Sequence, residues 1–261
     1  MTSGWGELLS LIGRRADLLA AILGGPARKP DLVEEIGVSR STVDRAVREL
    51  EDADLIERTN GRIEITVLGR LSFASYLKHR REIARMMEFS DVLTHLDSSA
   101  PVPHWFLVGA DLYRPDPPAV HRPHARARTE LEDVDRIEGL TKAITDPGVL
   151  DRFADAIRDG TLEVELVTTS EVLDHIVETR GSDLERGRRN GWLALYKYDE
   201  IPFGLLVADA DSPDERVLLF IYEDGHLVGV LQNRRQQAVD WALSLVRGIR
   251  HEAEPIEPIA D

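Results

Sequence analysis

The sequence lacks several features that would define a class of protein. It has no cysteine among its 261 residues, which excludes disulfide bonds, thiolate zinc sites and cysteine redox sensors. It also has no uninterrupted apolar run of about eighteen residues and no charged-then-apolar signal segment. We therefore expect a soluble protein of the cytoplasm with no membrane partner.

Lysine is scarce and acidic residues are in excess. The only four lysines are Lys29, Lys78, Lys142 and Lys197, so 28 of the 32 basic residues are arginine. The formal net charge is −15, of which −2 falls on residues 1–98 and −13 on residues 99–261. An acidic, lysine-poor surface stays hydrated in concentrated salt, and this predicts an origin in a halophile.

Residues 31–69 contain the ordered signals of a winged helix-turn-helix. A short amphipathic run ends at Gly37, a residue suited to the left-handed turn after a helix. Ser39 is a good N-cap for a second helix, whose buried stripe we expect at helical spacing. The members of this stripe are Val43, Ala46, Val47 and Leu50. Two alternating segments then flank Asn60-Gly61, the strongest short hairpin signal, and this hairpin would be the wing.

The outer face of the second helix carries side chains that suit DNA. A helix end fits the major groove, where each base pair shows its own donor and acceptor pattern. We expect base contacts from Arg40, Ser41, Thr42 and Arg45. We expect phosphate contacts from Arg48, Arg58 and Arg62, with support from Asn60. The alternative is a small helical domain that contacts protein, with these arginines as a solvated surface.

Helical patterns flank this region. Residues 5–24 predict a first helix broken at Gly13, and residues 69–96 predict a long helix. The long helix has more apolar residues than a small domain can cover, which favours pairing in a homodimer. We therefore divide the chain into a DNA-binding domain (1–69), a linking and dimerisation helix (70–97) and an effector domain (98–261).

After the turn-rich residues 97–103, strands and helices alternate. We expect strands at 105–109, 162–167, 192–198, 203–208, 217–222 and 227–231. We expect helices at 147–157, 171–179 and 235–251, and an irregular polar segment at 115–128. The mixture predicts an α/β sandwich. The whole chain is therefore expected to be α+β, with a winged helix-turn-helix, a long connecting helix and a C-terminal α/β sandwich.

Several motifs resemble a known family. Residues 31–69 look like the winged helices of archaeal regulators. The motifs Ile-Pro-Phe-Gly-Leu-Leu-Val (201–207), Leu-Val-Gly-Val-Leu-Gln-Asn (227–233) and Ala-Val-Asp-Trp-Ala (238–242) are similar to the effector half of regulators related to the methanogenesis regulatory protein. Residues 109–123 and 136–140 extend the likeness. The resemblance implies a phospholipase D-like fold without its activity, as in TrmB-type sugar regulators.

An enzyme of that fold would need a histidine with a lysine two positions later, to attack and hold phosphate. None of the eight histidines in the sequence has lysine at that position. A degenerate phosphodiesterase stays the alternative, and we expect no enzyme. His121 and His124 alone supply too few ligands for a metal, and no cofactor is expected.

Two strand-to-helix junctions are candidates for a small-molecule effector site. They comprise Thr168, Thr169 and Ser170, and Gln232 and Asn233 with Arg234. Helix N-termini suit anionic or polyhydroxyl metabolites, but the same residue types also serve as ordinary caps. His121, Arg122 and Arg126 in the polar segment could close over a ligand. The alternative is a second domain that recruits a protein and presents an apolar patch.

Overall fold

The computed structural model describes residues 4–210 and 212–256. They form two compact units that meet in the chain between Ala84 and Arg85. In the described part, no helix is long and apolar enough to cross a membrane.

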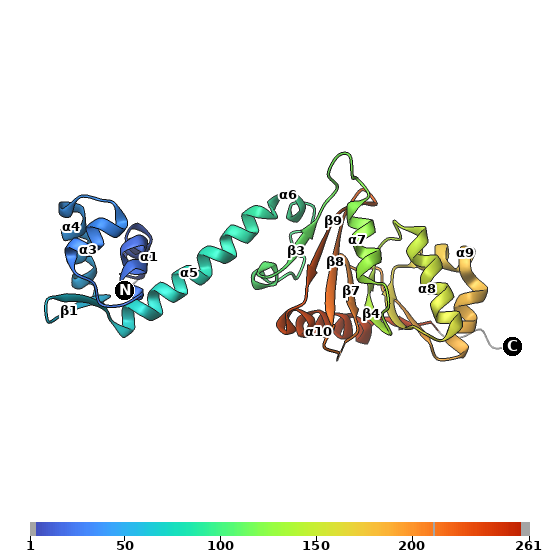
Figure 1. The fold of residues 1–261 in the computed structure, drawn as a ribbon. Coiled ribbons are helices and arrows are strands. Elements are labelled where there is room, and N and C mark those ends of the chain that lie inside the picture. Colours follow the sequence, from blue (N-terminus) through green and yellow to red (C-terminus); the bar gives the residue numbers. More distant parts are fainter. Residues whose placement is uncertain (1–3, 211, 257–261) are drawn as a thin grey trace. The chain divides into compact units, whose positions relative to one another are not determined.

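The first unit is a helical domain with a two-stranded hairpin (Figure 1). Its elements are α1 (Gly4–Arg14), α2 (Ala16–Leu23), α3 (Lys29–Ile36), α4 (Arg40–Asp52), β1 (Ile56–Thr59), β2 (Arg62–Ile65) and the first part of α5 (Val67–Glu88). The single helix expected over 5–24 is two helices, because the chain leaves helical geometry at Arg15 (φ −114°, ψ 18°). Gly13 stays helical and lies against the ring of Tyr76.

The structure contains the two helices, the turn and the hairpin expected within residues 31–69. Gly37 is left-handed (φ 73°) and ends α3, and the Ser39 hydroxyl accepts a hydrogen bond from the Thr42 backbone N–H. The expected stripe from Val43 to Leu50 is buried. In the hairpin, Asn60 and Gly61 both have positive φ, the conformation of a type I′ turn.

Gly69 allows the first turn of α5 to pack closely against the backbone at Leu55. A Cβ atom at this position would lie 1.9 Å from the Leu55 carbonyl oxygen, so only glycine allows the backbones to approach this closely. The helix does not run to residue 96 as expected. It ends at Glu88, and a short α6 (Ser90–Leu93) follows with Phe89 as its N-cap. Phe89 and Val92 are buried in the core of the second unit, which requires the chain to turn there.

The second unit is built on an eight-stranded sheet with the order β10-β6-β5-β4-β7-β8-β9-β3. The strands are β3 (Asp111–Tyr113), β4 (Arg136–Thr141), β5 (Glu163–Thr168), β6 (Leu193–Lys197), β7 (Gly204–Ala208), β8 (Arg216–Glu223), β9 (His226–Asn233) and β10 (Glu254–Pro255). β4, β5 and β6 are parallel, and the other pairings are antiparallel.

Helices cover both faces of this sheet. They are η1 (His104–Leu107), α7 (Arg122–Glu130), α8 (Pro147–Asp159), α9 (Ser170–Arg189) and α10 (Gln236–Glu252). Along β7, Leu205 and Val207 pack in the core that includes α10, whereas Leu206 and Ala208 pack in the core that includes α8. Alternate residues therefore enter opposite cores, and the expected α/β sandwich is confirmed.

Three expectations for the second unit are wrong. The apolar run at 105–109 is not a strand: its first part lies in η1, where Phe106 packs against Trp241 with ring centres 4.9 Å apart. The segment expected to be irregular contains α7, which buries only the narrow stripe Pro123, Ala127 and Glu130. The central strand β4 was not expected. It contains Glu138, a carboxylate buried beside Arg136 and Arg247.

Candidate DNA-contact surface and effector pocket

The start of α4 presents the residues expected to contact bases. Arg40, Ser41 and Arg45 are exposed, and Thr42 is half-buried. The Ser39 hydroxyl lies 2.9 Å from that of Ser41 and 2.8 Å from that of Thr42, so these hydroxyls form a capping network. Because these hydroxyls bond to one another, the long side chains of Arg40 and Arg45 are the groups of this face that extend furthest toward a partner.

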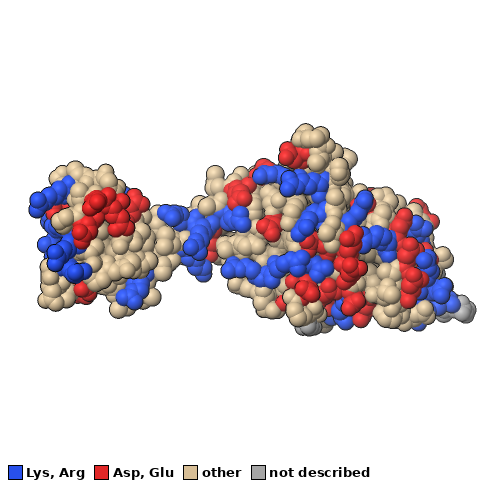
Figure 2. All heavy atoms as spheres, in the orientation of Figure 1, with Lys and Arg blue, Asp and Glu red and all other residues tan. Residues whose placement is uncertain are grey.

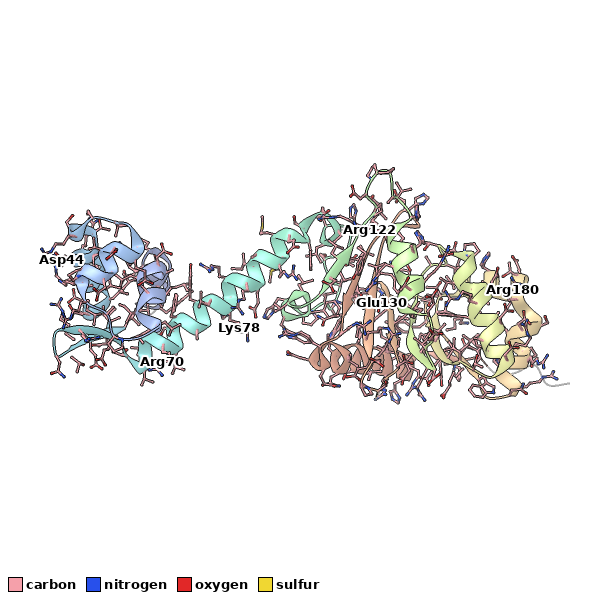
Figure 3. The ribbon with its side chains drawn as sticks, viewed as in Figure 1. Asp44, Arg70, Lys78, Arg122, Glu130 and Arg180 are labelled. Carbon is pink, nitrogen blue, oxygen red and sulfur yellow. The ribbon has the colours of Figure 1, made fainter. Side chains whose placement is uncertain are left out.

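Asp44 lies on α4 between Thr42 and Arg45 and is half-buried. It forms an ion pair with Lys29, and this hydrogen bond lowers the pKa of the Asp44 carboxyl group. Arg40 and Arg48 act in the same direction through their charge. Figure 2 shows basic side chains at the end of the first unit that carries α4, beside a group of acidic side chains, and Figure 3 labels Asp44 at that end. Neighbouring basic groups thus compensate the negative charge of the Asp44 carboxylate, which reduces its repulsion of phosphate.

The expected phosphate contacts on the wing differ in their present partners. Arg58 makes a bidentate ion pair with Glu51 of α4, with N···O distances of 2.6 and 2.8 Å. Arg62 donates a single 3.3 Å hydrogen bond to the Pro26 carbonyl. Arg48 and Asn60 are exposed, as are Lys78, Arg80 and Arg81 on α5. Lys78 is labelled in Figure 3. Arg62 is therefore easier to redirect to a phosphate than Arg58.

The first expected effector junction uses its polar groups within the protein. Thr169 is the N-cap of α9 and accepts from the Val172 N–H, while the Thr168 hydroxyl donates to the Thr141 carbonyl. The Ser170 N–H and hydroxyl both donate to Asp199, at 2.7 and 3.1 Å. Accepting these bonds lowers the pKa of the Asp199 carboxyl group.

In the second junction, Gln232 and Asn233 are buried, and both side chains form hydrogen bonds within the protein. Asn233 donates to the Phe106 carbonyl (2.6 Å) and accepts from the Arg235 N–H (2.9 Å). Gln232 accepts from the Tyr113 hydroxyl and from Arg126, each at 3.3 Å. These bonds tie the end of β9 to η1, β3 and α7.

The sheet topology separates the two junctions. Thr168 pairs with Thr141 at the carboxyl end of β4, whereas Asn233 pairs with Val217, next to the residues aligned with the amino end of β4. Three strands, β4, β7 and β8, lie between β5 and β9. The structure therefore brings Arg126 and Gln232 together. It leaves Thr168, Thr169 and Ser170 three strands away, at the opposite end of β4.

The polar segment around α7 is anchored by a buried carboxylate. Glu130 pairs with Arg126, Arg216 and Arg234. The guanidinium group of Arg126 also lies over the Tyr113 ring, 5.0 Å from its centre. His121, immediately before α7, and Arg122 are exposed. Figure 3 shows Arg122 and Glu130 at opposite ends of α7.

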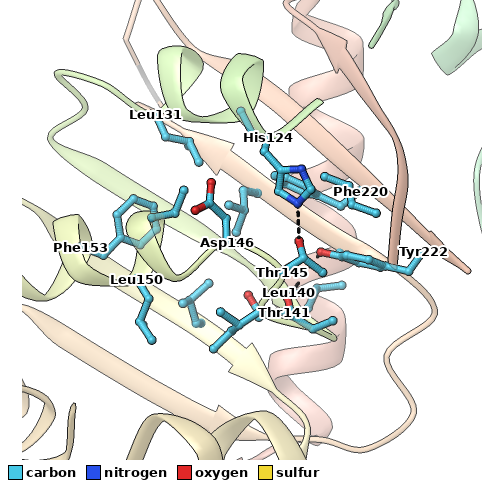
Figure 4. Close-up of a pocket in the computed structure, with 18 of the residues that line it drawn as sticks. His124, Leu131, Leu140, Thr141, Thr145, Asp146, Leu150, Phe153, Phe220 and Tyr222 are labelled. Carbon is cyan, nitrogen blue, oxygen red and sulfur yellow. Dashed lines mark hydrogen bonds between the residues drawn. The ribbon is translucent and has the colours of Figure 1, made fainter. Parts of the chain in front are cut away.

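A cavity of about 120 Å³ lies between α7, α8 and the sheet (Figure 4). We call it the α7–α8 pocket. Its walls are mainly apolar and include Leu131, Leu140, Leu150, Phe153, Leu206 and Phe220. Its polar lining comes from His124, Thr141, Thr145, Asp146 and Tyr222. Of these polar residues, the sequence pattern pointed only to His124, as a metal ligand, because the residues come from elements distant in the chain.

The polar groups of the pocket are mostly uncharged. His124 Nε2 lies 3.2 Å from the Thr145 hydroxyl, and burial lowers the pKa of His124. The Tyr222 hydroxyl donates to the Ala143 carbonyl at 3.5 Å, and burial raises its pKa. Burial opposes ionisation of Asp146, but the bonds from Arg128 outweigh this effect and lower its pKa. Asp146 also caps α8 through the Gly148 N–H.

Among solved structures, TrmBL2, described as an archaeal chromatin protein with a novel mode of DNA binding, is 12% identical, with 96% of this chain and 99% of that chain covered and a TM-score of 0.45. The phospholipase D family member Nuc from Salmonella typhimurium is 10% identical, covering 57% and 97%, with a TM-score of 0.41. An IclR homolog from Microbacterium is 13% identical, covering 93% and 97%, with a TM-score of 0.25. Likeness at this level carries no information on activity or partners.

Family models give the identification. Residues 6–88 match the HVO_A0261 N-terminal domain, and residues 120–252 match the middle domain of the methanogenesis regulatory protein FilR1. No curated protein matches the chain. The second match spans just over half of the sequence and confirms the resemblance expected for its second part. The chain therefore belongs to the family defined by the middle domain of the methanogenesis regulatory protein FilR1.

Proposed function

We propose that this protein is a transcription regulator that binds double-stranded DNA through its first unit. The observation that carries the proposal is the exposed arginine face of α4, formed by Arg40, Arg45 and Arg48. This face lies opposite the buried stripe of the helix and is followed by a hairpin with its own exposed arginines. The order of turn, reading helix and wing fits major-groove docking better than a protein-contact surface.

The α4 arginines would form hydrogen bonds with base edges in the major groove, and Arg62 would bind a phosphate of the DNA backbone. Arg58 becomes available to phosphate only when its pair with Glu51 opens. The excess of acidic over basic residues favours a halophilic host. Concentrated salt weakens the gain from counterion release, so base contacts would supply a larger share of specific affinity there.

Selection from a random duplex pool tests this proposal. The full chain, equilibrated with the pool in concentrated potassium chloride, should enrich one sequence family, and its members should then bind more tightly than scrambled duplexes. Arg45→Ala should relax this preference, and Arg152→Ala in α8 is the matched control, because it removes an exposed arginine of the second unit. Failure of the wild-type chain to enrich any sequence across a range of salt concentrations would overturn DNA recognition.

We further propose that the protein is a homodimer joined through α5. Ile83 and Met87, one helical turn apart, are 59% and 69% exposed, more than a monomer needs to leave in water. Leu93, which the sequence pattern places with them, packs against the core of the second unit. The dimer surface is therefore narrower than the apolar pattern of residues 69–96 indicates.

Met87→Glu should yield monomers, because a carboxylate in an apolar seam is costly to bury. Ala74→Glu, at another exposed position of α5, is the control and should stay dimeric. Light scattering at micromolar concentration in high salt measures both. A monomeric wild-type chain would contradict the proposal.

The second unit is proposed to sense a small molecule rather than to catalyse a reaction or recruit a protein. The α7–α8 pocket favours this choice, since it is a concave apolar site with a few polar groups. The two junctions stay secondary candidates because capping and sheet contacts occupy the groups described above. A ligand would change the DNA affinity of the protein only if it binds the DNA-competent state and the DNA-incompetent state with different affinities.

A further inference from the structure

We infer that the α7–α8 pocket binds an uncharged molecule the size of a single six-membered ring, carrying one hydroxyl group, of the phenol class. The inference rests on the proposed sensing function and names its ligand chemistry. It differs from the anionic or polyhydroxyl metabolite that the strand-to-helix junctions indicate.

The size of the cavity sets the first limit. Protein interiors are close-packed, and voids much larger than one water molecule are few. A cavity of about 120 Å³ approaches the engineered apolar cavity of about 150 Å³ that accepts benzene. A six-membered ring with a small substituent matches this volume, whereas a sugar phosphate or nucleotide exceeds it.

The placement of the walls sets the second limit. Figure 4 shows Leu131, Leu150 and Phe153 on one side, while His124, Thr145 and Tyr222 gather on the other. A ring can therefore contact apolar atoms while its hydroxyl group donates to the Tyr222 oxygen, which can accept while it donates to Ala143, or replaces the Thr145 hydroxyl at His124 Nε2. Burying an apolar ligand restores the dispersion contacts that the cavity walls lack.

The charge of the lining sets the third limit. His124 and Tyr222 are held in their neutral forms by burial. Arg128 is occupied by both oxygens of Asp146, at 2.6 and 2.8 Å. A carboxylate or phosphate in the pocket would meet the Asp146 charge and find its nearest cation already paired, which is unfavourable. The pocket therefore selects against anions of the same size.

The test measures thermal unfolding of the full chain with phenol, benzene, benzoate or inorganic phosphate. Phenol should raise the Tm of the second unit in a saturable manner, benzene should do so more weakly, and benzoate and phosphate should have no saturable effect. His124→Leu should lower phenol affinity several-fold and leave benzene affinity unchanged, because it removes a hydrogen-bonding group. Stabilisation by phosphate or benzoate but not by phenol would overturn the inference.

A cavity-filling variant locates the binding. Ala127 lies in the pocket wall and Ala125 is exposed on the same helix. Ala127→Leu should weaken phenol binding by at least about tenfold, while Ala125→Leu should bind normally. Should Ala127→Leu not fold, nuclear Overhauser effects from phenol protons to Leu150 and Phe153 in the wild-type chain give the location. Absence of these effects at saturating phenol, or equal loss in both variants, would place phenol elsewhere and overturn the inference.

Selection of a duplex in the same samples separates the two proposals. A chain that binds DNA but ignores phenol contradicts the ligand class and leaves the DNA-binding role intact. A chain that binds phenol in this pocket but enriches no DNA sequence contradicts the proposed function and leaves the pocket chemistry intact.

Discussion

Helix α4 in the first unit and helix α9 in the second both begin at a hydroxyl N-cap. Ser39 accepts from the Thr42 N–H, and Thr169 accepts from the Val172 N–H. Beyond the caps the surroundings differ, because Arg40 and Arg45 follow on α4, whereas Ser170 on α9 is bound to Asp199. A hydroxyl at a helix start therefore identifies the cap, and the charge beside it indicates whether a partner can bind there.

The two units also differ in how they use charge. The first 98 residues are nearly neutral, and α4 and the wing carry five of their exposed arginines. In the second unit, Arg126, Arg216 and Arg234 surround one buried carboxylate, Glu130. Arginine there stabilises packing, so basic residues alone would not distinguish a DNA surface from a structural cluster.

The largest expected effect separates the stabilities of the two units. Gly69→Ala should destabilise the first unit by about 3 kcal/mol or more, since its Cβ would overlap the Leu55 carbonyl. Calorimetry of the full chain should show the transition of the first unit at lower temperature and that of the second unit unchanged. Gly6→Ala, where a Cβ meets open space, is the control. Equal effects of both variants would refute the close-approach explanation.

A smaller effect tests the junctions of the second unit. Asn233→Ala should cost about 1 to 3 kcal/mol because it leaves the buried Phe106 carbonyl without its donor. Thr169→Ala removes only a cap, which is worth about 1 kcal/mol. Chemical denaturation measures both. DNA affinity should stay within a few-fold of normal, and a reversed order of stabilities would contradict the structural role assigned to Asn233.

A third prediction converts a paired arginine into a free one. Glu51→Gln should release Arg58 and strengthen binding to all duplexes alike, with a gain of about 0.2 to 1 kcal/mol, the usual worth of an exposed ion pair. Titrations of matched and scrambled duplexes measure it. Glu57→Gln removes the same charge from the hairpin strand that carries Arg58, without breaking the Arg58–Glu51 pair, and serves as the control. A similar gain in the control would mean that net charge, rather than Arg58, is responsible.

The smallest predicted effect concerns pH. Burial lowers the pKa of His124 below its ordinary value of 6.5. As the pH falls below 6.5, the unfolded chain therefore takes up this proton before the folded chain does, and stability is lost. His124→Gln should reduce the loss of Tm between pH 7 and pH 5 relative to wild type. An identical pH profile for the variant would contradict the assignment.

Local chemistry explains why some elements could be predicted from the sequence. Gly37, Ser39 and the Asn60-Gly61 turn act through their own backbone conformation and immediate neighbours. The apolar run at 105–109 has no such local signal. Its continuous apolar sequence suits a strand or a helical turn equally, and the contact of Phe106 with Trp241 on a distant helix decides between them.

Long-range pairing explains what the sequence could not predict. Glu138 in β4 is acceptable in the core because it pairs with Arg136 and with Arg247, and Arg247 lies more than one hundred residues later in the chain. The α7–α8 pocket likewise combines α7, α8 and strands that the sheet topology brings together. Its His124 and Tyr222 have no shared motif in the sequence.

The measurement that tests the central claim most directly compares Arg45→Ala with Arg62→Ala on matched and scrambled duplexes at several salt concentrations. Arg45→Ala should lose about 1 to 3 kcal/mol of specific binding and relax the sequence preference. Arg62→Ala should weaken binding to all sequences equally and reduce the salt slope by about one ion. Equal loss of preference in both variants would contradict the assignment of α4 as the reading helix and of the hairpin as a backbone clamp.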